Sequence, residues 1–183
     1  YMSVAEESIN EKKYILFVPN MEPERTTNPD AGFFGDLELI LSVLEASLPD
    51  GWVILYKEHF GNFRLPIRPD NVRNEFFYKR ILRSHPSVRF APFTLNARSL
   101  IDKAEAVVTT AGTPGWEARV RGKPVLVFGA GWYGDCDGVF RIQSFSECQV
   151  VLENIMRNQT GLKEEGPSEY LYSYLGEALD IMH

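Results

Sequence analysis

The sequence predicts an α/β fold, specifically a Rossmann-like parallel sheet with helices on both faces. Five short apolar runs rich in β-branched residues recur along the chain, at residues 14–18, 52–56, 88–91, 106–109 and 125–128. Most of the segments between these runs carry apolar residues at helical spacing, as the crossover connections of a parallel sheet require. The length of 183 residues fits one domain of ordinary size.

The runs are nearly continuous in apolar residues, which is typical of strands covered on both faces. Apolar residues at helical spacing follow Asp36 and again Asn74, two residue types that cap helix starts. Shorter helices are expected at 97–104 and 116–120. The order of these patterns along the chain is therefore that of successive βα units.

Past residue 140 the alternation weakens. A capped helix is expected at 146–157, a polar connection at 158–167 and an amphipathic helix at 168–181. We therefore predict a single domain over residues 1–183, with a core at about 14–142 and a helical C-terminal extension at about 143–183.

Composition excludes several classes of protein. Hydrophobic residues make up 44% of the chain and charged residues 24%, so it can bury a core. The net charge is −6, from 19 basic and 25 acidic residues, and the bases form no stripe, so nucleic acid is not an expected partner. No apolar run approaches the ~20 residues that span a bilayer. We expect a cytoplasmic protein, or one peripheral to the inner membrane, with Cys136 and Cys148 as free thiols.

Polar clusters follow several of the predicted strands. The carboxyl ends of parallel strands meet at one edge of the sheet, where ligands bind in open α/β folds. The segments that emerge there are 19–36, 57–59, 109–115 and 129–134. The first is a long loop rich in Pro, Glu, Thr and Asn, and loops of this length are commonly functional or disordered.

The most informative of these segments is 109–117, a strand end followed by a turn of small residues and a helix start. Gly112 and Gly115 allow close approach of the backbone to a ligand, and the first N–H groups of the helix favour an anion such as phosphate. Thr110 and Thr113 offer hydroxyls to phosphate oxygens. Glu117 is expected within the first helical turn, where it can accept hydrogen bonds from a ribose diol. The alternative is that the glycines only turn the chain and that Glu117 complements the helix dipole.

His59 follows the second strand, with Lys57 and Glu58 beside it. Histidine can donate to a phosphate or exchange a proton near neutral pH, so His59 is the candidate catalytic residue. Glu24 and Arg25 lie in the long first loop, where they can contact the donor phosphates or an acceptor. A structural histidine and solvated loop charges are the alternatives.

Residues 129–134 spell G-x-G-x-x-G after a strand, the fingerprint of a dinucleotide site. We interpret this match as coincidental, because the fingerprint belongs to the first βα unit and must begin a helix, whereas 135–138 continue as loop. Trp132 and Tyr133 are instead predicted to wall a donor pocket.

Several of these motifs occur together and in order: Glu24 in its loop, 57–59, 112–118, 122–125, 128–129 and 132–133. In this arrangement the chain resembles the capsule polysaccharide biosynthesis proteins over about residues 14–142. That family consists largely of bacterial glycosyltransferases of two-domain GT-B architecture, several of which use CMP-activated sugars such as Kdo. The resemblance implies the C-terminal, donor-binding half. Phe60 stands where members resembling this chain usually carry proline.

The resemblance implies the donor-binding domain of a capsule or surface polysaccharide glycosyltransferase, with a CMP- or UDP-linked sugar as ligand. An oligosaccharide or glycolipid acceptor would bind through a facing N-terminal domain, without which the chain is expected to be inactive. No cofactor and no metal are expected. Two alternatives stay open: a non-catalytic sugar-nucleotide-binding module, and an enzyme like the UDP-N-acetylglucosamine 2-epimerases, which share the glycine turn.

Overall fold

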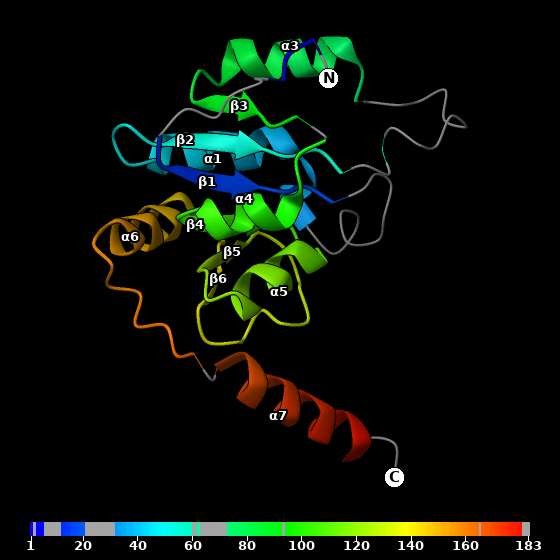
Figure 1. The fold of residues 1–183 in the computed structure, drawn as a ribbon, viewed down its shortest axis with the longest axis vertical. Coiled ribbons are helices and arrows are strands. Elements are labelled where there is room, and N and C mark those ends of the chain that lie inside the picture. The colour runs from blue at the N-terminus through cyan, green and yellow to red at the C-terminus, as the bar shows by residue number, and fades with distance from the viewer. Residues whose placement is uncertain are drawn as a thin grey trace.

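Six strands form one parallel sheet in the order β3-β2-β1-β4-β5-β6 (Figure 1). The computed structural model describes residues 1, 3–5, 12–20, 32–59, 62, 73–92, 94–164 and 166–180, without the side chains of 33 and 176–180. The strands are β1 (Tyr14–Phe17), β2 (Val53–Tyr56), β3 (Val88–Phe90), β4 (Ala106–Thr109), β5 (Val125–Val127) and β6 (Val139–Arg141). Every residue of β1, β2, β4 and β5 is buried, as their apolar sequences predicted. The α/β, Rossmann-like class is confirmed.

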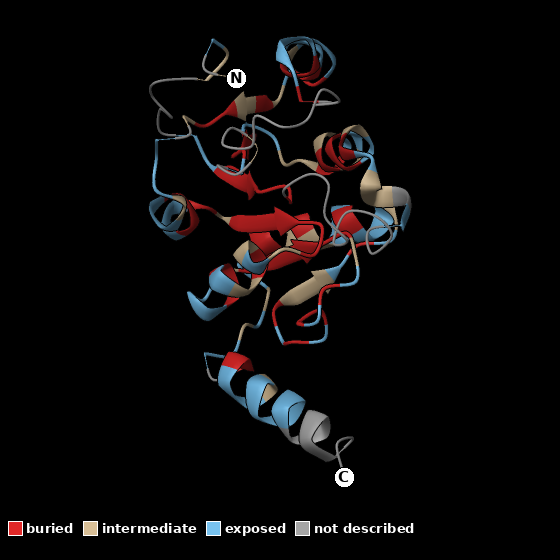
Figure 2. Cartoon of the chain, turned by 90° about the vertical axis from the view of Figure 1, so that its right-hand side faces the viewer, coloured by how far each residue is buried: buried red, intermediate tan, exposed pale blue. Residues whose placement is uncertain are grey.

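Helices cover both faces of the sheet. They are α1 (Leu37–Ser47), α3 (Glu75–Ser84), α4 (Ala97–Lys103), α5 (Thr113–Val120), α6 (Phe145–Met156) and α7 (Gly166–Asp180), with a 3₁₀ turn at Gly32–Gly35. Alternate residues of β1 enter different cores: Ile15 and Phe17 pack with α1, α3 and α6, and Leu16 packs with α4 and α5. The alternation follows from the two-residue period of a strand. Figure 2 shows the sheet as the buried centre of the molecule.

Side chains cap most of the helix starts. Asp36 Oδ1 accepts a hydrogen bond from the Glu38 N–H at 2.9 Å, and Asn74 Oδ1 accepts one from the Phe77 N–H at 3.0 Å. These contacts confirm the two helix starts inferred from the sequence. Helix α5 differs, because its cap residue is Gly112, which supplies no side-chain acceptor.

Two details differ from the sequence prediction. Strand β6 was not predicted, because it has three residues, is only partly buried and lies at the sheet edge, so it lacks the apolar run of a central strand. Helix α5 begins at Thr113 and not at Trp116, because Pro114 suits the first helical turn. Glu117 therefore lies in the second turn, which corrects its predicted position in the first.

Residues 129–134 begin no helix, as expected for a coincidental match to the dinucleotide fingerprint. They run through turns toward β6.

The C-terminal region divides into two parts. Helix α6 packs against α1 and so belongs to the covering layer of the sheet. Helix α7 projects away from the sheet and is largely exposed (Figures 1 and 2). The Tyr170 hydroxyl donates to the Trp132 carbonyl at 2.5 Å, and the Tyr174 ring lies 5.3 Å from the Trp132 ring. Contacts of α7 with the body therefore include an aromatic cluster.

The direction of the strand order reverses between β1 and β4, since β2 and β3 lie on one side and β5 and β6 on the other. In open parallel sheets this switch point opens a crevice at the carboxyl ends of the strands. The residues that follow β1 and β4 are therefore the first place to look for a site.

Candidate functional site

Asn20 and Thr109 meet at the switch point. Asn20 follows β1 and is 6% exposed, and Thr109 ends β4 and is fully buried. The Thr109 hydroxyl donates to Asn20 Oδ1 at 3.4 Å and accepts from the Gly112 N–H at 3.3 Å. The loop after β1, the end of β4 and the start of α5 are thus joined at one point. Sequence reasoning missed Asn20, whose only signal was its place just after a strand.

The turn before α5 is packed so closely that it requires glycine. A Cβ on Gly112 would lie 2.5 Å from Asn20 Oδ1, and a Cβ on Gly115 would lie 2.3 Å from the Tyr133 hydroxyl oxygen. Tyr133 is fully buried, and its hydroxyl donates to the Gly112 carbonyl at 2.5 Å. Burial raises the pKa of Tyr133, which keeps the hydroxyl protonated as a donor. Both glycines predicted for the site therefore shape its floor, and Tyr133 supports that floor from behind.

Two buried polar atoms beside this turn have no hydrogen-bond partner among the described residues: Asn20 Nδ2 and Thr110 Oγ1. Thr110 is fully buried and directly follows β4. An unpaired buried polar group costs about 1 to 3 kcal/mol and calls for an explanation. Both atoms belong to the switch point, where an amide donor and a hydroxyl can each bind a ligand oxygen.

The remaining residues predicted around α5 lie at its surface. Thr113 and Glu117 are exposed and, one helical turn apart, share a face of α5. Trp132 is 38% exposed and its ring lies 4.9 Å from that of Trp116. Glu24 and Arg25 lie outside the described residues.

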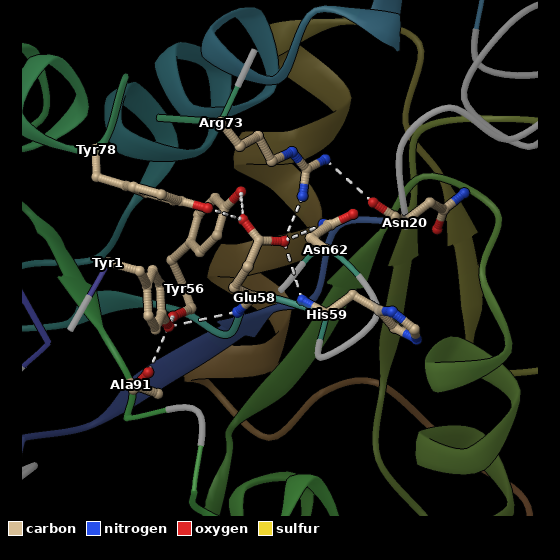
Figure 3. A network of polar contacts seen from close by, with 9 residues as sticks. All are labelled: Tyr1, Asn20, Tyr56, Glu58, His59, Asn62, Arg73, Tyr78 and Ala91. Atoms are coloured by element: carbon tan, nitrogen blue, oxygen red, sulfur yellow. Dashed lines mark hydrogen bonds and ion pairs between the residues drawn. The ribbon is translucent and has the colours of Figure 1, made fainter. Parts of the chain in front are cut away.

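The three residues predicted after β2 divide between core and surface. Lys57 is buried, its ammonium donates to the Pro92 carbonyl at 3.2 Å, and burial lowers its pKa. His59 is exposed at the carboxyl edge of the sheet, and its ring points away from Glu58 (Figure 3). Of the three, His59 is therefore the residue that an incoming ligand can reach.

Glu58 is 1% exposed and stands at the centre of a polar network (Figure 3). Glu58 Oε1 accepts hydrogen bonds from the His59 N–H at 2.9 Å, from Asn62 Nδ2 at 2.8 Å and from the Arg73 guanidinium. Glu58 Oε2 accepts hydrogen bonds from two hydroxyls, that of Tyr78 at 2.8 Å and that of Tyr56 at 3.2 Å. Burial, with the negative charge of Glu58, raises the pKa of both tyrosines and keeps them as donors. Sequence reasoning missed Arg73, because nothing local to it indicates an ion pair with Glu58.

Other ligand classes find less support. The described part of the chain contains no group of three or more His, Cys, Asp or Glu residues arranged to hold a metal ion. A cavity of about 270 Å³ between the starts of α1 and α3 is lined by two acidic residues, Asp36 and Glu38, and by two arginines, Arg73 and Arg80, so the charges of its lining balance. None of the helices over the described residues has the length and apolar character needed to cross a membrane.

At the carboxyl edge of the sheet, the structure brings together a helix start without a side-chain cap, two buried polar atoms with no partner among the described residues, and an exposed histidine after a neighbouring strand. The sequence model of the capsule polysaccharide biosynthesis protein family matches residues 6–154, most of the chain. The chain belongs to this family. No curated protein matches this chain in sequence.

Solved structures similar to this chain support the same fold. One is the beta Kdo 2,7 transferase of KpsC from Thermosulfurimonas dismutans, with 19% identity, a TM-score of 0.56 and coverage of 78% of this chain and 46% of that chain. Another is MnaA of S. aureus solved with UDP, with 14% identity, a TM-score of 0.54 and coverage of 92% and 47%. A third is the UDP-GlcNAc 2-epimerase of Methanocaldococcus jannaschii in complex with UDP-GlcNAc and UDP, with 14% identity, a TM-score of 0.54 and coverage of 96% and 47%. The chain spans less than half of the length of each, and the likeness establishes a GT-B-type Rossmann-like fold.

Proposed function

We propose that this chain is the sugar-nucleotide donor-binding domain of a capsule polysaccharide glycosyltransferase, with a CMP- or UDP-linked sugar as ligand. The single observation that carries the proposal is a pair of buried atoms beside the glycine start of α5, Asn20 Nδ2 and Thr110 Oγ1, for which the described residues supply no hydrogen-bond partner. Family membership supports capsule synthesis, and the structural neighbours solved with UDP or UDP-GlcNAc support the ligand class. A cytoplasmic location, or a peripheral one at the inner membrane, is part of the same proposal.

In this proposal the phosphate lies at the start of α5. The Thr113 N–H at the helix start and the hydroxyls of Thr110 and Thr113 bind its oxygens, and Gly112 and Gly115 shape the turn that receives it. Glu117 accepts hydrogen bonds from the ribose diol, one turn further along the exposed face of α5.

His59 is the proposed catalytic residue. Its imidazole donates to the phosphate and stabilises the negative charge that develops as the glycosidic bond breaks. Trp132 walls the ligand site, Tyr133 is packed beneath the turn, and Lys57 is buried. Glu24 and Arg25 are proposed to contact the donor from the loop after β1. The acceptor, an oligosaccharide or glycolipid, would enter from a facing domain.

The variant Thr110→Val tests the proposal most directly. Because Thr110 Oγ1 has no hydrogen-bond partner in the described part of the chain, replacing the hydroxyl by a methyl group should leave the fold as stable or raise its stability by about 1 kcal/mol. The same change should weaken CMP or UDP binding about tenfold, since one hydrogen bond to the ligand is lost. Calorimetry and thermal unfolding measure the two effects. Unchanged affinity for both nucleotides would show that the Thr110 hydroxyl does not contact the ligand.

Two further variants separate the parts of the ligand. Glu117→Ala should weaken nucleotide and nucleoside alike, by about 1 to 3 kcal/mol, because it contacts the ribose that both share. His59→Ala should weaken the nucleotide and leave the nucleoside unchanged. Glu153→Ala on α6 is the matched control for Glu117, since α6 packs against α1, on the face of the sheet opposite α5. If His59→Ala weakened the binding of nucleotide and nucleoside equally, His59 would have a structural role and would not contact the phosphate.

The solved epimerases favour a second candidate, inversion at carbon 2 of UDP-GlcNAc. Incubation of the chain with UDP-GlcNAc, followed by chromatography of the product, tests this second candidate. Formation of the epimer would favour this second candidate.

A further inference from the structure

The Glu58 carboxylate is enclosed by protein donors. Five side-chain or backbone groups donate to its two oxygens, and its side chain is 0% exposed in the ion pair with Arg73, itself 3% exposed. Removing both charges from water is expensive, so such a pair is weak evidence for stability as such. The role of the pair is therefore better explained by the loop geometry that it fixes.

The pair joins two loops at the carboxyl edge of the sheet. Glu58 holds its own loop after β2 through the His59 N–H, and it holds Arg73 just before α3. The other guanidinium nitrogen of Arg73 donates to the Asn20 carbonyl at 3.1 Å, in the loop after β1. One buried carboxylate therefore orients residues on both of these loops.

Asn20 is fixed from two directions. Arg73 holds its carbonyl, and the Thr109 hydroxyl donates to its Oδ1 at 3.4 Å. Because Oδ1 is the acceptor in that contact, Nδ2 remains as a buried donor without a partner among the described residues, next to the Gly112 turn. Figure 3 shows the side-chain amide pointing away from Arg73.

We propose that Glu58 and Arg73 are a positioning pair that presents Asn20 Nδ2 as a hydrogen-bond donor to a phosphate oxygen of the bound nucleotide. This inference rests on the proposed function and adds a ligand residue, Asn20, and the pair that orients it. Glu58 contributes through the two loops and does not touch the ligand.

The decisive variant is Arg73→Lys. A lysine ammonium can still neutralise Glu58, but as a point charge it cannot reproduce the two-pronged contact with Glu58 and the Asn20 carbonyl. The chain should fold, and affinity for CMP or UDP should fall about tenfold, the loss of one good hydrogen bond. Affinity for cytidine or uridine should not change. A nucleotide affinity equal to that of the wild type would overturn the proposal.

A double-mutant cycle tests whether Arg73 acts through Asn20. Asn20→Ala should weaken nucleotide binding by a similar factor, and the double variant should be no weaker than either single variant, because both remove the same contact. Additive losses would mean that Arg73 does not act through Asn20. Glu58→Gln should behave as Arg73→Lys does.

The matched control is Glu45→Gln at the opposite edge of the sheet. Glu45 accepts from the Ser87 N–H at 2.7 Å and pairs with buried His85 at 3.0 Å, so it is also a carboxylate that orders a loop. Its replacement should leave nucleotide affinity unchanged. A loss equal to that in Glu58→Gln would show a general effect of destabilisation and would overturn the proposal.

A measurement without ligand separates this proposal from the proposed function. In nuclear magnetic resonance spectra, Arg73→Lys should shift or broaden the Asn20 side-chain amide signals, and Glu45→Gln should not. If no nucleotide binds to the wild type, the proposed function fails and these spectra still decide whether the pair orients Asn20. Unchanged Asn20 signals in Arg73→Lys would overturn the positioning role.

Discussion

Gly115 shows how a single residue constrains the candidate site. It lies in the first turn of α5, and the buried Tyr133 ring fills the space where a side chain would project. The Tyr133 hydroxyl uses the same space to reach the Gly112 carbonyl. The turn that is proposed to receive the phosphate is thus held in shape from below by an aromatic side chain.

Gly115→Ala should therefore destabilise the fold by about 1 to 3 kcal/mol, the usual cost of overpacking a filled core. Gly131→Ala is the matched control, because its Cβ would lie 3.4 Å from the nearest atom, in ordinary contact. In Gly115→Ala, adding Tyr133→Phe should recover part of the loss by removing the closest atom. Chemical denaturation measures all four proteins, and equal stability of the two alanine variants would contradict the packing argument.

Cys148 should make the unfolding free energy depend on pH in the alkaline range. Burial raises the pKa of its thiol from 9.0 to about 11. Because the folded state holds the proton more tightly, the thiol's contribution to stability is complete below about pH 9 and is lost as pH rises through about 11. The difference in unfolding free energy between wild type and Cys148→Ala should be constant below pH 9 and should shrink above it. Denaturant titrations under reducing conditions measure this difference, and a constant value up to pH 11 would contradict the prediction.

Among the elements, α5 joins the candidate site to the C-terminal region. Arg119, near its end, is 1% exposed. Its Nε donates to the Asp137 carbonyl at 2.5 Å and its Nη2 to the Lys163 carbonyl at 2.5 Å. Asp137 in turn accepts from the Lys163 N–H at 2.9 Å. One side chain thus holds the loop before β6 and the connection that leads to α7.

Arg119→Leu should destabilise the fold by about 3 kcal/mol, since it leaves two carbonyls without their donor and removes the ion pair with Asp137. It should also speed trypsin cleavage after Lys163, because the connection loses its anchor. The control is Arg121→Leu, which breaks only an exposed pair with Asp102 and should cost less than about 1 kcal/mol. Equal cleavage rates in the two variants would show that Arg119 does not hold the connection.

At the scale of the whole molecule, the parallel sheet gathers the proposed ligand groups at one edge. Asn20, His59 and the residues around Gly112 follow three different strands, and all three strands end at the same edge. The matched chains of known structure are about twice as long. Enzymes of GT-B type react in the cleft between two such domains, so one wall orients the donor and the facing domain supplies the acceptor.

We therefore predict that the 183-residue chain, produced alone, unfolds cooperatively and binds a CMP or UDP compound but transfers no sugar. Its two apolar clusters supply the core, while in the proposed function a facing domain supplies the acceptor groups. Calorimetry and an assay with CMP- and UDP-sugars and oligosaccharide acceptors measure the two properties. Turnover that survives stringent purification and disappears in His59→Ala would show that the domain is a complete enzyme.

The local parts of this protein could be predicted from the sequence. Strands β1, β2, β4 and β5 are continuous apolar runs, and the helices α1 and α3 begin at Asp36 and Asn74. These features depend on residues within a few positions of each other, where periodicity and capping act. The glycine turn at 112–115 and its place at the carboxyl edge were predicted for the same reason. Whether the residues around it bind a donor stays a prediction.

Only the tertiary structure decided which side chains meet. Nothing near Asn20 indicates that it lies against Thr109, 89 positions away, or that Arg73 reaches its carbonyl across 53 positions. The sequence also placed Glu58 among the ligand residues, whereas packing surrounds its carboxylate with protein donors. Contacts between distant residues depend on strand order and on how loops pack, and one sequence records neither. The type and position of the elements were therefore local properties, and the hydrogen bonds around the candidate site were properties of the fold.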